Sequence, residues 1–272
     1  MEVNKVKVPE DADFDRLRRL ADDDDGWTLV YNKKTAKVWT RPSPIPTSEF
    51  KMIRARVEFG DVAASTAYDV LHDPVYREQW DKYMLDSVDI GVLNPNNDLC
   101  YYAVRSPPGL RHRDFVLQRS WLDMGNEQLI FNHSVCHDDH MPRKDYIRAI
   151  SYLTGYVVRP AGPQACVLTY VTHSDPRGKL PSWLINKITT IVTPKVMRRL
   201  HKACQAYPAW KSRNDPDWRP WSRADQIPEA RVSLSKCQPH QGEYDAQVDE
   251  SRIGEVKLED ERDRSTTPLP PL

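Results

Sequence analysis

His112, Arg113 and Asp114 form the tripeptide found in the catalytic loop of protein kinases, where the aspartate accepts a proton from the attacking hydroxyl. Kinase chemistry also needs a glycine-rich loop over the phosphates, a later asparagine and an Asp-Phe-Gly segment. None of these accompanies the tripeptide, which runs directly into the strand-like stretch FVLQRSW. We therefore do not expect phosphoryl transfer.

A second group of reactive side chains comprises His133, His137, Asp138, Asp139 and His140. Such side chains bind metal ions when a helix or a folded loop makes them converge. Here they lie where a strand is expected to end in a turn, a setting typical of a solvated loop. A Gly-x-Ser-x-Gly nucleophile elbow is also absent. The sequence thus predicts no catalytic residue, no metal site and no cofactor.

Arg77 and Asp81 are spaced one helical turn apart, after Asp73 as a helix N-cap and Pro74 at the first helical position. On the residues alone the pair is interpreted as an exposed i,i+4 ion pair worth a few tenths of a kcal/mol.

The elements that must position these groups follow from hydrophobic periodicity. A short helix over 13–20 precedes three strands, two helices and a strand meander with turn residues in its spacers. Strands that follow one another without helices indicate an antiparallel sheet. The expected strands are 27–31, 36–40, 50–59, 87–93, 99–105, 113–122, 128–135, 146–158 and 166–173.

The strongest helical pattern runs from Pro181 to Trp210, with apolar residues at intervals of three and four and with Pro194 expected to kink it. This segment carries five basic residues and no acidic one. One long apolar helix beside a curved antiparallel sheet predicts an α+β helix-grip fold. We expect about nine strands gripping the C-terminal helix around an internal cavity.

Composition narrows the class of protein. Lys+Arg and Asp+Glu both number 39 in the 272 residues, which disfavours nucleic-acid binding. Five cysteines without a C-x-x-C pair favour a reducing cytosol. No apolar run approaches the 18 residues of a membrane span. Residues 243–263 contain nine acidic and three basic residues, and the proline-rich segment PLPPL follows them. We therefore expect this C-terminal segment to be disordered.

Several segments resemble START domains of the phosphatidylcholine-transfer subgroup over about residues 8–221. They are DPVYREQWDKY, YYAVRSPPGLRHRDF, RKDYIRAISYLTGY and PSWLINKITTIVTPKVMRRLHKACQAYP. The resemblance implies a cytoplasmic carrier, peripheral to membranes, that binds one phospholipid and transfers it. The expected ligand is phosphatidylcholine, with phosphatidylethanolamine as a second candidate. We expect a flexible N-terminus over 1–9, a START domain over 10–212 and a mostly disordered tail over 213–272.

The resemblance also assigns site residues. Arg77 matches the family's phosphate-binding arginine and Asp81 its neighbouring carboxylate, while Tyr102, Phe115 and Tyr152 match the aromatic positions around choline. A quaternary ammonium has no N–H to donate, so aromatic faces supply the attraction. The family pattern has Trp at the position of Tyr102 and Tyr at that of Phe115, which leaves selectivity between choline and ethanolamine open.

Lipid uptake requires the enclosure to open, and the long helix is the expected gate. Its basic stripe would dock transiently on anionic membrane surfaces, although a merely solvated face explains the same pattern. The expected gate residues are Trp183, Leu184, Ile188, Lys195, Arg198, Arg199 and Lys202. We expect a monomer. Two rival functions are a START-type binder or sensor of sterol or another apolar ligand, and a hydrolase or cyclase that uses the same cavity.

Overall fold

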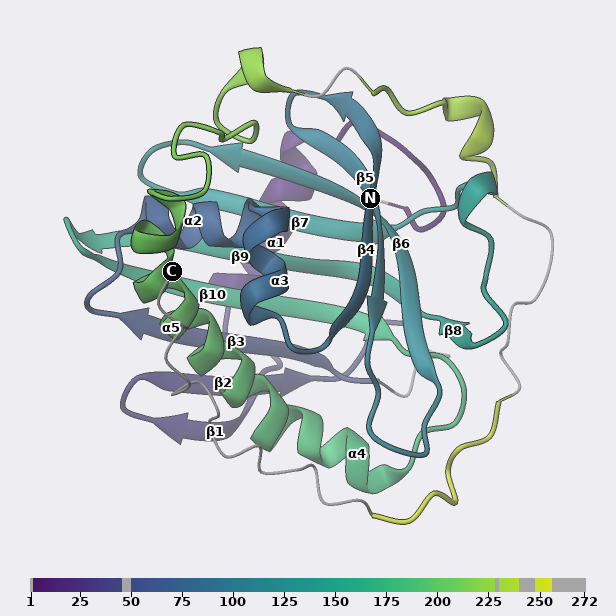
Figure 1. Cartoon of the computed structure of the whole chain (residues 1–272). Coiled ribbons are helices and arrows are strands. Elements are labelled where there is room, and N and C mark those ends of the chain that lie inside the picture. Colours follow the sequence, from purple (N-terminus) through teal and green to yellow (C-terminus); the bar gives the residue numbers. More distant parts are fainter. Residues whose placement is uncertain (1, 46–49, 228–229, 240–247, 256–272) are drawn as a thin grey trace, which may run out of the picture.

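The computed structural model describes residues 2–45, 50–227, 230–239 and 248–255 (Figure 1). Its first part contains α1 (Asp11–Asp22), β1 (Thr28–Lys33), β2 (Ala36–Arg41), β3 (Met52–Phe59), α2 (Ala64–His72), α3 (Pro74–Trp80), β4 (Met84–Asn94) and β5 (Asn97–Val104). There follow β6 (His112–Asp123), β7 (Gln128–Ser134), η1 (Asp138–His140), β8 (Tyr146–Arg148), β9 (Ile150–Gly162) and β10 (Ala165–Asp175). The remaining elements are α4 (Ser182–Lys187), η2 (Ile188–Val192), α5 (Thr193–Lys211), η3 (Ala224–Gln226) and η4 (Leu234–Lys236).

The strands form one curved sheet in the order β1-β2-β3-β10-β9-β7-β6-β5-β4, and every pairing along this path is antiparallel. Helices α2, α3, α4 and α5 lie on one side of the sheet, here called the inner face (Figure 1). Within the described residues the sheet has ten strands, and a long C-terminal helix crosses it. The predicted α+β helix-grip fold is thereby confirmed.

Helix α1 covers the other side of the sheet. Its apolar residues Phe14 and Leu17 pack with Leu129, Phe131 and Leu153 of the strands below. The rings of Phe14 and Phe131 meet edge to face, 5.0 Å apart. Because side chains alternate along a strand, this packing assigns the odd-numbered residues of β7, and of β9 from Leu153 to Val157, to the outer face and the even-numbered ones to the inner face. A bulge at Tyr152 breaks the alternation at the start of β9.

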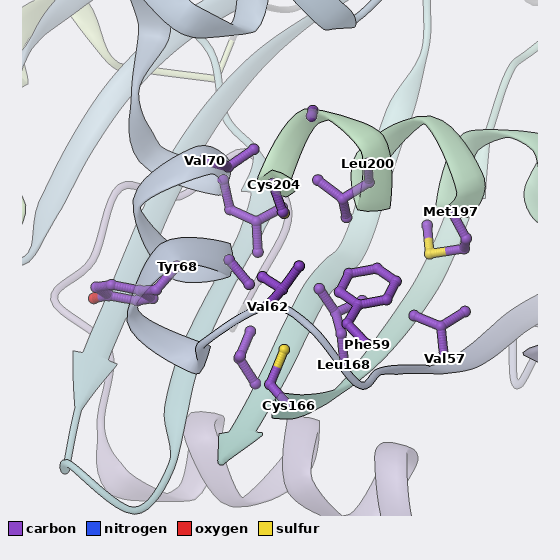
Figure 2. Packing of buried hydrophobic residues seen from close by; sticks show 14 of the residues in the cluster. Val57, Phe59, Val62, Tyr68, Val70, Cys166, Leu168, Met197, Leu200 and Cys204 are labelled. Carbon is purple, nitrogen blue, oxygen red and sulfur yellow. The ribbon is translucent and has the colours of Figure 1, made fainter. Parts of the chain in front are cut away.

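The inner-face core holds the C-terminal helix to the sheet (Figure 2). Met197 and Leu200 of α5 pack with Val57 and Phe59 of β3 and with Leu168 of β10. All five side chains are buried. Burying such side chains contributes roughly 1.5–3 kcal/mol each. The second half of the helix is therefore a structural wall of the domain.

Asp73 joins α3 to α5. One carboxylate oxygen accepts the backbone N–H of Tyr76 at 3.0 Å, which confirms the predicted N-cap. The other oxygen accepts the hydroxyl of Tyr207 at 2.9 Å and the ammonium of Lys211 at 3.0 Å. Asp73 is completely buried. A buried carboxylate is tolerated only when its oxygens are paired in this way.

The long helix is not a continuous α-helix. A π-helical segment over Ile188–Val192 separates α4 from α5 and ends two residues before Pro194. Proline lacks the N–H of a regular helical turn. The hydroxyl of Thr193 donates to the carbonyl of Ile188 at 2.9 Å and supplies a local hydrogen bond instead. Such π segments inside helices are often found at functional sites.

Two features differ from expectation. The strand expected over 146–158 is divided at Ala149: β8 runs parallel to β6, and β9 then crosses to β7 and β10. Arg148 makes a bidentate ion pair with the buried Asp114 of β6, which fixes this detour. Local periodicity does not encode which neighbour a strand selects.

The described tail segments make contacts that their polar composition did not predict. Arg231 pairs with Val92 on the edge strand β4, Cys237 is buried, and Glu250 is buried in an ion pair with Arg113. Residues 2–9 also contact the sheet, where Lys7 exchanges two backbone hydrogen bonds with the side chain of Gln118. The division at residues 9 and 212 stays a prediction. Most of the acidic stretch and the segment PLPPL lie outside the described residues.

Candidate functional site

Arg77, Asp81 and Tyr102 are brought together between α3 and β5. Arg77 donates to the carbonyl of Leu71 at 2.8 Å, and its guanidinium nitrogen lies 3.6 Å from a carboxylate oxygen of Asp81. That same oxygen accepts the hydroxyl of Tyr102 at 2.6 Å. The Arg77 side chain is 21% exposed and that of Asp81 13%. This is a half-buried arrangement, and the long ion-pair distance leaves the guanidinium fork only partly engaged.

The surroundings of Arg77 place it against the inner face. Its guanidinium carbon lies 5.5 Å from the ring centre of Trp80. Burial raises the pKa of Tyr102 above its usual value. The nearby negative charge of Asp81 raises this pKa further, and the positive charge of Arg77 lowers it. Burial likewise raises the pKa of Tyr156 on β9, which the charges of Arg77 and Asp81 also reach. The pair therefore belongs to the space between α3 and the sheet and differs from an ordinary surface ion pair.

The three expected choline-binding positions are not equally close. Tyr102 of β5 and Phe115 of β6 are directly opposite each other in the antiparallel register, so their side chains share the inner face. Tyr152 lies on β9, which β7 separates from β6. At about 4.8 Å per strand it stands roughly 10 Å away along the sheet. The ring of Tyr152 lies 4.6 Å from that of His173, which shares the outer face with Val171 under α1. The register of β9 against β10 shifts between Ser151 and Leu153, so Tyr152 does not lie on the inner face with Tyr102 and Phe115.

Two further tyrosines on the inner face were not expected at the site. The rings of Tyr156 on β9 and Tyr170 on β10 lie 5.0 Å apart. Burial raises the pKa of both hydroxyls, yet both side chains retain accessible surface. This combination is expected of groups that border an interior space. Alternation of Thr154, Tyr156 and Val158 along the strand is the signal that points to this face in the sequence.

A polar row crosses the inner face in register. Asp98, Arg119, Asn132, Thr154 and Thr172 are successive cross-strand partners on β5, β6, β7, β9 and β10. Arg119 makes a bidentate ion pair with Asp98. The hydroxyls of Thr154 and Thr172 are 2.8 Å apart. Hydrogen bonds within the row satisfy groups that an apolar wall would otherwise leave unpaired.

The expected gate residues lie along α4, the π-helical segment and α5. Trp183 is half-buried, and its indole N–H donates to the carbonyl of Ile253 in the tail at 2.9 Å. Arg198 and Lys202 are exposed, whereas Arg199 is half-buried with its guanidinium 5.2 Å from the ring centre of Tyr83. Leu184 is buried, and Ile188 and Lys195 are half-buried. The basic stripe is therefore only partly exposed.

Other candidate sites contribute nothing to this constellation. In the described part of the chain, no group of three or more histidines, cysteines and carboxylates is arranged to hold a metal. Asp114 of the kinase-like tripeptide pairs with Arg148, and Arg113 pairs with Glu250. A pocket of about 370 Å³ lies at the end of α5 beside Trp210 and includes none of the expected site residues. No helix among the described residues is long and apolar enough to cross a membrane.

Comparison with known proteins agrees with this architecture. A family model described as START domain matches residues 7–210. Mouse START domain-containing protein 10 is 40% identical over 254 residues, which cover 93% of this chain and 87% of the relative. Human phosphatidylcholine transfer protein is 25% identical over 151 residues, or 54% of this chain and 70% of the relative.

Solved structures show the same relationship. Human STARD10 is 40% identical and superposes with a TM-score of 0.80 over 86% of this chain and 96% of the other. Human StAR-related lipid transfer protein 5 is 19% identical, with a TM-score of 0.64 over 72% of this chain and 95% of the other, and shares the fold. The family model spans most of the chain, and the 40% identical relative is covered almost to its full length. The chain therefore belongs to the START domain family.

Proposed function

We propose that this protein binds one phospholipid and transfers it between membranes without changing it chemically. The observation that carries the proposal is the half-buried Arg77–Asp81–Tyr102 cluster on the inner side of a START domain. Membership of a family that includes phosphatidylcholine transfer protein supports the choice of ligand. The expected headgroups are phosphocholine and, as a second candidate, phosphoethanolamine.

Arg77 would bind the lipid phosphate. Its guanidinium contacts Asp81 at only 3.6 Å and keeps forked donors for a second anion. Asp81 is held by the hydroxyl of Tyr102 and by the backbone N–H of Tyr83 at 3.2 Å, so it stays in place when the phosphate arrives. A guanidinium remains charged even when buried, which suits it to a site closed from water.

The headgroup would lie beside Tyr102 and Phe115, which share one face of neighbouring strands. Aromatic faces attract a quaternary ammonium by about 0.5–2 kcal/mol each. Tyr156 and Tyr170 extend the aromatic surface toward β10. Tyr152 lies against His173 on the other face of the sheet, so its assignment to the choline site is supported by the family resemblance alone.

The acyl chains explain why the lipid must be enclosed. A diacyl phospholipid exposes about 30 methylenes, and at ~0.8 kcal/mol each their hydration costs on the order of 25 kcal/mol. An open groove would leave much of that cost in place. The inner face of the sheet and the helices α4 and α5 that lie on that side are the surfaces available to cover the chains.

Uptake and release would take place at the first half of the long helix. The core contacts of Met197 and Leu200 and the buried Lys211–Asp73 pair hold α5, whereas the π-helical segment separates α4 from that support. Exposed Arg198 and Lys202 would approach an anionic membrane surface transiently. A carrier of this kind needs no catalytic residue and no cofactor.

A vesicle assay tests the proposal. The full chain should move fluorescent phosphatidylcholine from donor to acceptor vesicles, and the recovered lipid should be intact. Formation of lysolipid or free headgroup, in amounts proportional to protein concentration, would contradict the carrier function and favour a hydrolase. Failure to move phospholipid, with tight binding of a sterol, would favour the sensor.

A further inference from the structure

The described tail segment 248–255, here called the strap, crosses the end of the domain where α4 begins. Its backbone pairs with the loop between β10 and α4: the N–H of Lys179 donates to Val248 and the N–H of Glu250 donates to Lys179, both at 2.9 Å. An added Cβ on Gly178 would lie 2.7 Å from the carbonyl oxygen of Val248. Gly178 also has a φ of +71°, so glycine is required for this close approach.

Glu250 anchors the strap. Its side chain is 6% exposed; one carboxylate oxygen accepts the backbone N–H of Arg111 and the other accepts the guanidinium of Arg113, both at 2.7 Å. A carboxylate is buried only where such partners offset its desolvation. The contact is therefore a built anchor. A loosely associated acidic tail would not bury its carboxylate in this way.

The far end of the strap reaches the gate itself. The carbonyl of Ile253 accepts the indole N–H of Trp183 at 2.9 Å, and Glu255 forms an ion pair with Lys187. The side chain of Ile253 also lies against Gly109 in the loop between β5 and β6. One strap thus ties together the β5–β6 loop, the β10–α4 loop and helix α4.

We propose that the strap is a latch that holds α4 closed and that an anionic membrane surface releases it by competing for the same basic and aromatic groups. This proposal rests on the proposed lipid-transfer function and names its regulation. The strap carries Asp249, Glu250 and Glu255 against one base, Arg252, and so presents the same sign of charge as an anionic membrane. While Trp183 and Lys187 are engaged by the strap, they cannot contact lipid headgroups.

The test compares Glu250→Gln with Asp249→Asn in the full chain. Both remove one negative charge, but Asp249 is exposed and 3.9 Å from Lys179, whereas Glu250 is the buried anchor. In Glu250→Gln, Arg113 would still donate hydrogen bonds to the carbonyls of Pro176, Arg111 and Arg177, at 3.0, 2.6 and 3.2 Å. The domain should therefore stay folded without the Glu250 carboxylate. Urea unfolding checks this.

Glu250→Gln should raise amide hydrogen exchange at Lys179 by at least about tenfold while β9 amides stay protected. It should also speed phosphatidylcholine transfer from anionic vesicles by about threefold or more, because uptake follows the population of released strap. Asp249→Asn should do neither. Glu255→Gln, which breaks only the exposed link to Lys187, should act in the same direction as Glu250→Gln but more weakly.

The latch proposal is wrong if Glu250→Gln speeds amide exchange at Lys179 but leaves phosphatidylcholine transfer unchanged or slower. It is also wrong if Glu250→Gln and Asp249→Asn transfer lipid at equal rates. These outcomes are distinct from failure of the proposed function. A wild-type chain that transfers no phospholipid contradicts the carrier function whatever the variants do.

Discussion

Replacing Arg77 with alanine removes a hydrogen bond to the carbonyl of Leu71 and an ion pair with Asp81 at 3.6 Å. The ion pair is half-buried but long, at 3.6 Å, so it is worth about 1 kcal/mol, and the hydrogen bond contributes about 1 kcal/mol. Asp81 keeps the hydroxyl of Tyr102 and the N–H of Tyr83. Unfolding free energy should therefore fall by no more than about 2 kcal/mol, and the fold should survive.

The effect on lipid binding should be much larger. If Arg77 binds the lipid phosphate as proposed, its loss leaves the phosphate without a charged partner in a closed site, at a cost of about 3–5 kcal/mol. That corresponds to at least about a hundredfold in affinity. Arg77→Lys should recover only part of this loss, because an ammonium lacks the fork.

The assay is native mass spectrometry of the purified full chain, combined with urea unfolding. Arg143→Ala provides the matched control: Arg143 pairs with Asp86 at 3.0 Å, but both side chains are about half exposed. The control should keep its bound phospholipid. A folded Arg77→Ala protein that still carries one phospholipid per chain would refute the headgroup assignment.

Three further predictions concern the gate, the choline site and pH. Arg198→Glu with Lys202→Glu, both exposed, should slow transfer from anionic vesicles at low salt and leave the bound lipid in place; equal rates at every ionic strength would contradict docking through this stripe. Phe115→Ala should weaken choline lipids more than ethanolamine lipids, by about 0.5–2 kcal/mol in a lipid competition assay, whereas Tyr152→Ala, on the outer face, should change neither; an equal effect of Phe115→Ala on both lipids would remove Phe115 from the choline site. Burial keeps the pKa of His72 well below its usual value, so the unfolded chain binds a proton that the folded chain does not. Below about pH 6.5 the free energy of unfolding should therefore fall by about 1.4 kcal/mol per pH unit because of His72. Denaturant unfolding of His72→Phe at several pH values should show a pH dependence that is smaller by this amount.

The fold could be predicted from the sequence because its signals are local. Asp73 and Pro74 mark the start of α3, and the three- and four-residue spacing from Leu184 to Leu200 marks the long helix. Alternation and turn residues indicate an antiparallel sheet. The division of β8 from β9 was missed because it depends on Arg148 reaching Asp114, a contact between segments 34 residues apart.

The site was predictable only in part. Resemblance to the family identified Arg77, Asp81 and Tyr102, and the structure brings these three together. The polar row through Arg119 was missed, because strand register decides which side chains become neighbours across a sheet. Glu250 could not be recognised either: in a polar, acidic segment nothing distinguishes the one carboxylate that a buried arginine selects.

The central claim is that this START domain encloses a phospholipid, and identification of the bound lipid tests it most directly. Native mass spectrometry of the full chain purified from cells should show one additional mass per chain, and extraction should release an intact phospholipid. Phosphatidylcholine is the expected main species, with phosphatidylethanolamine as the alternative. A sterol in its place, or a chain that binds no phospholipid when vesicles are supplied, would contradict the account.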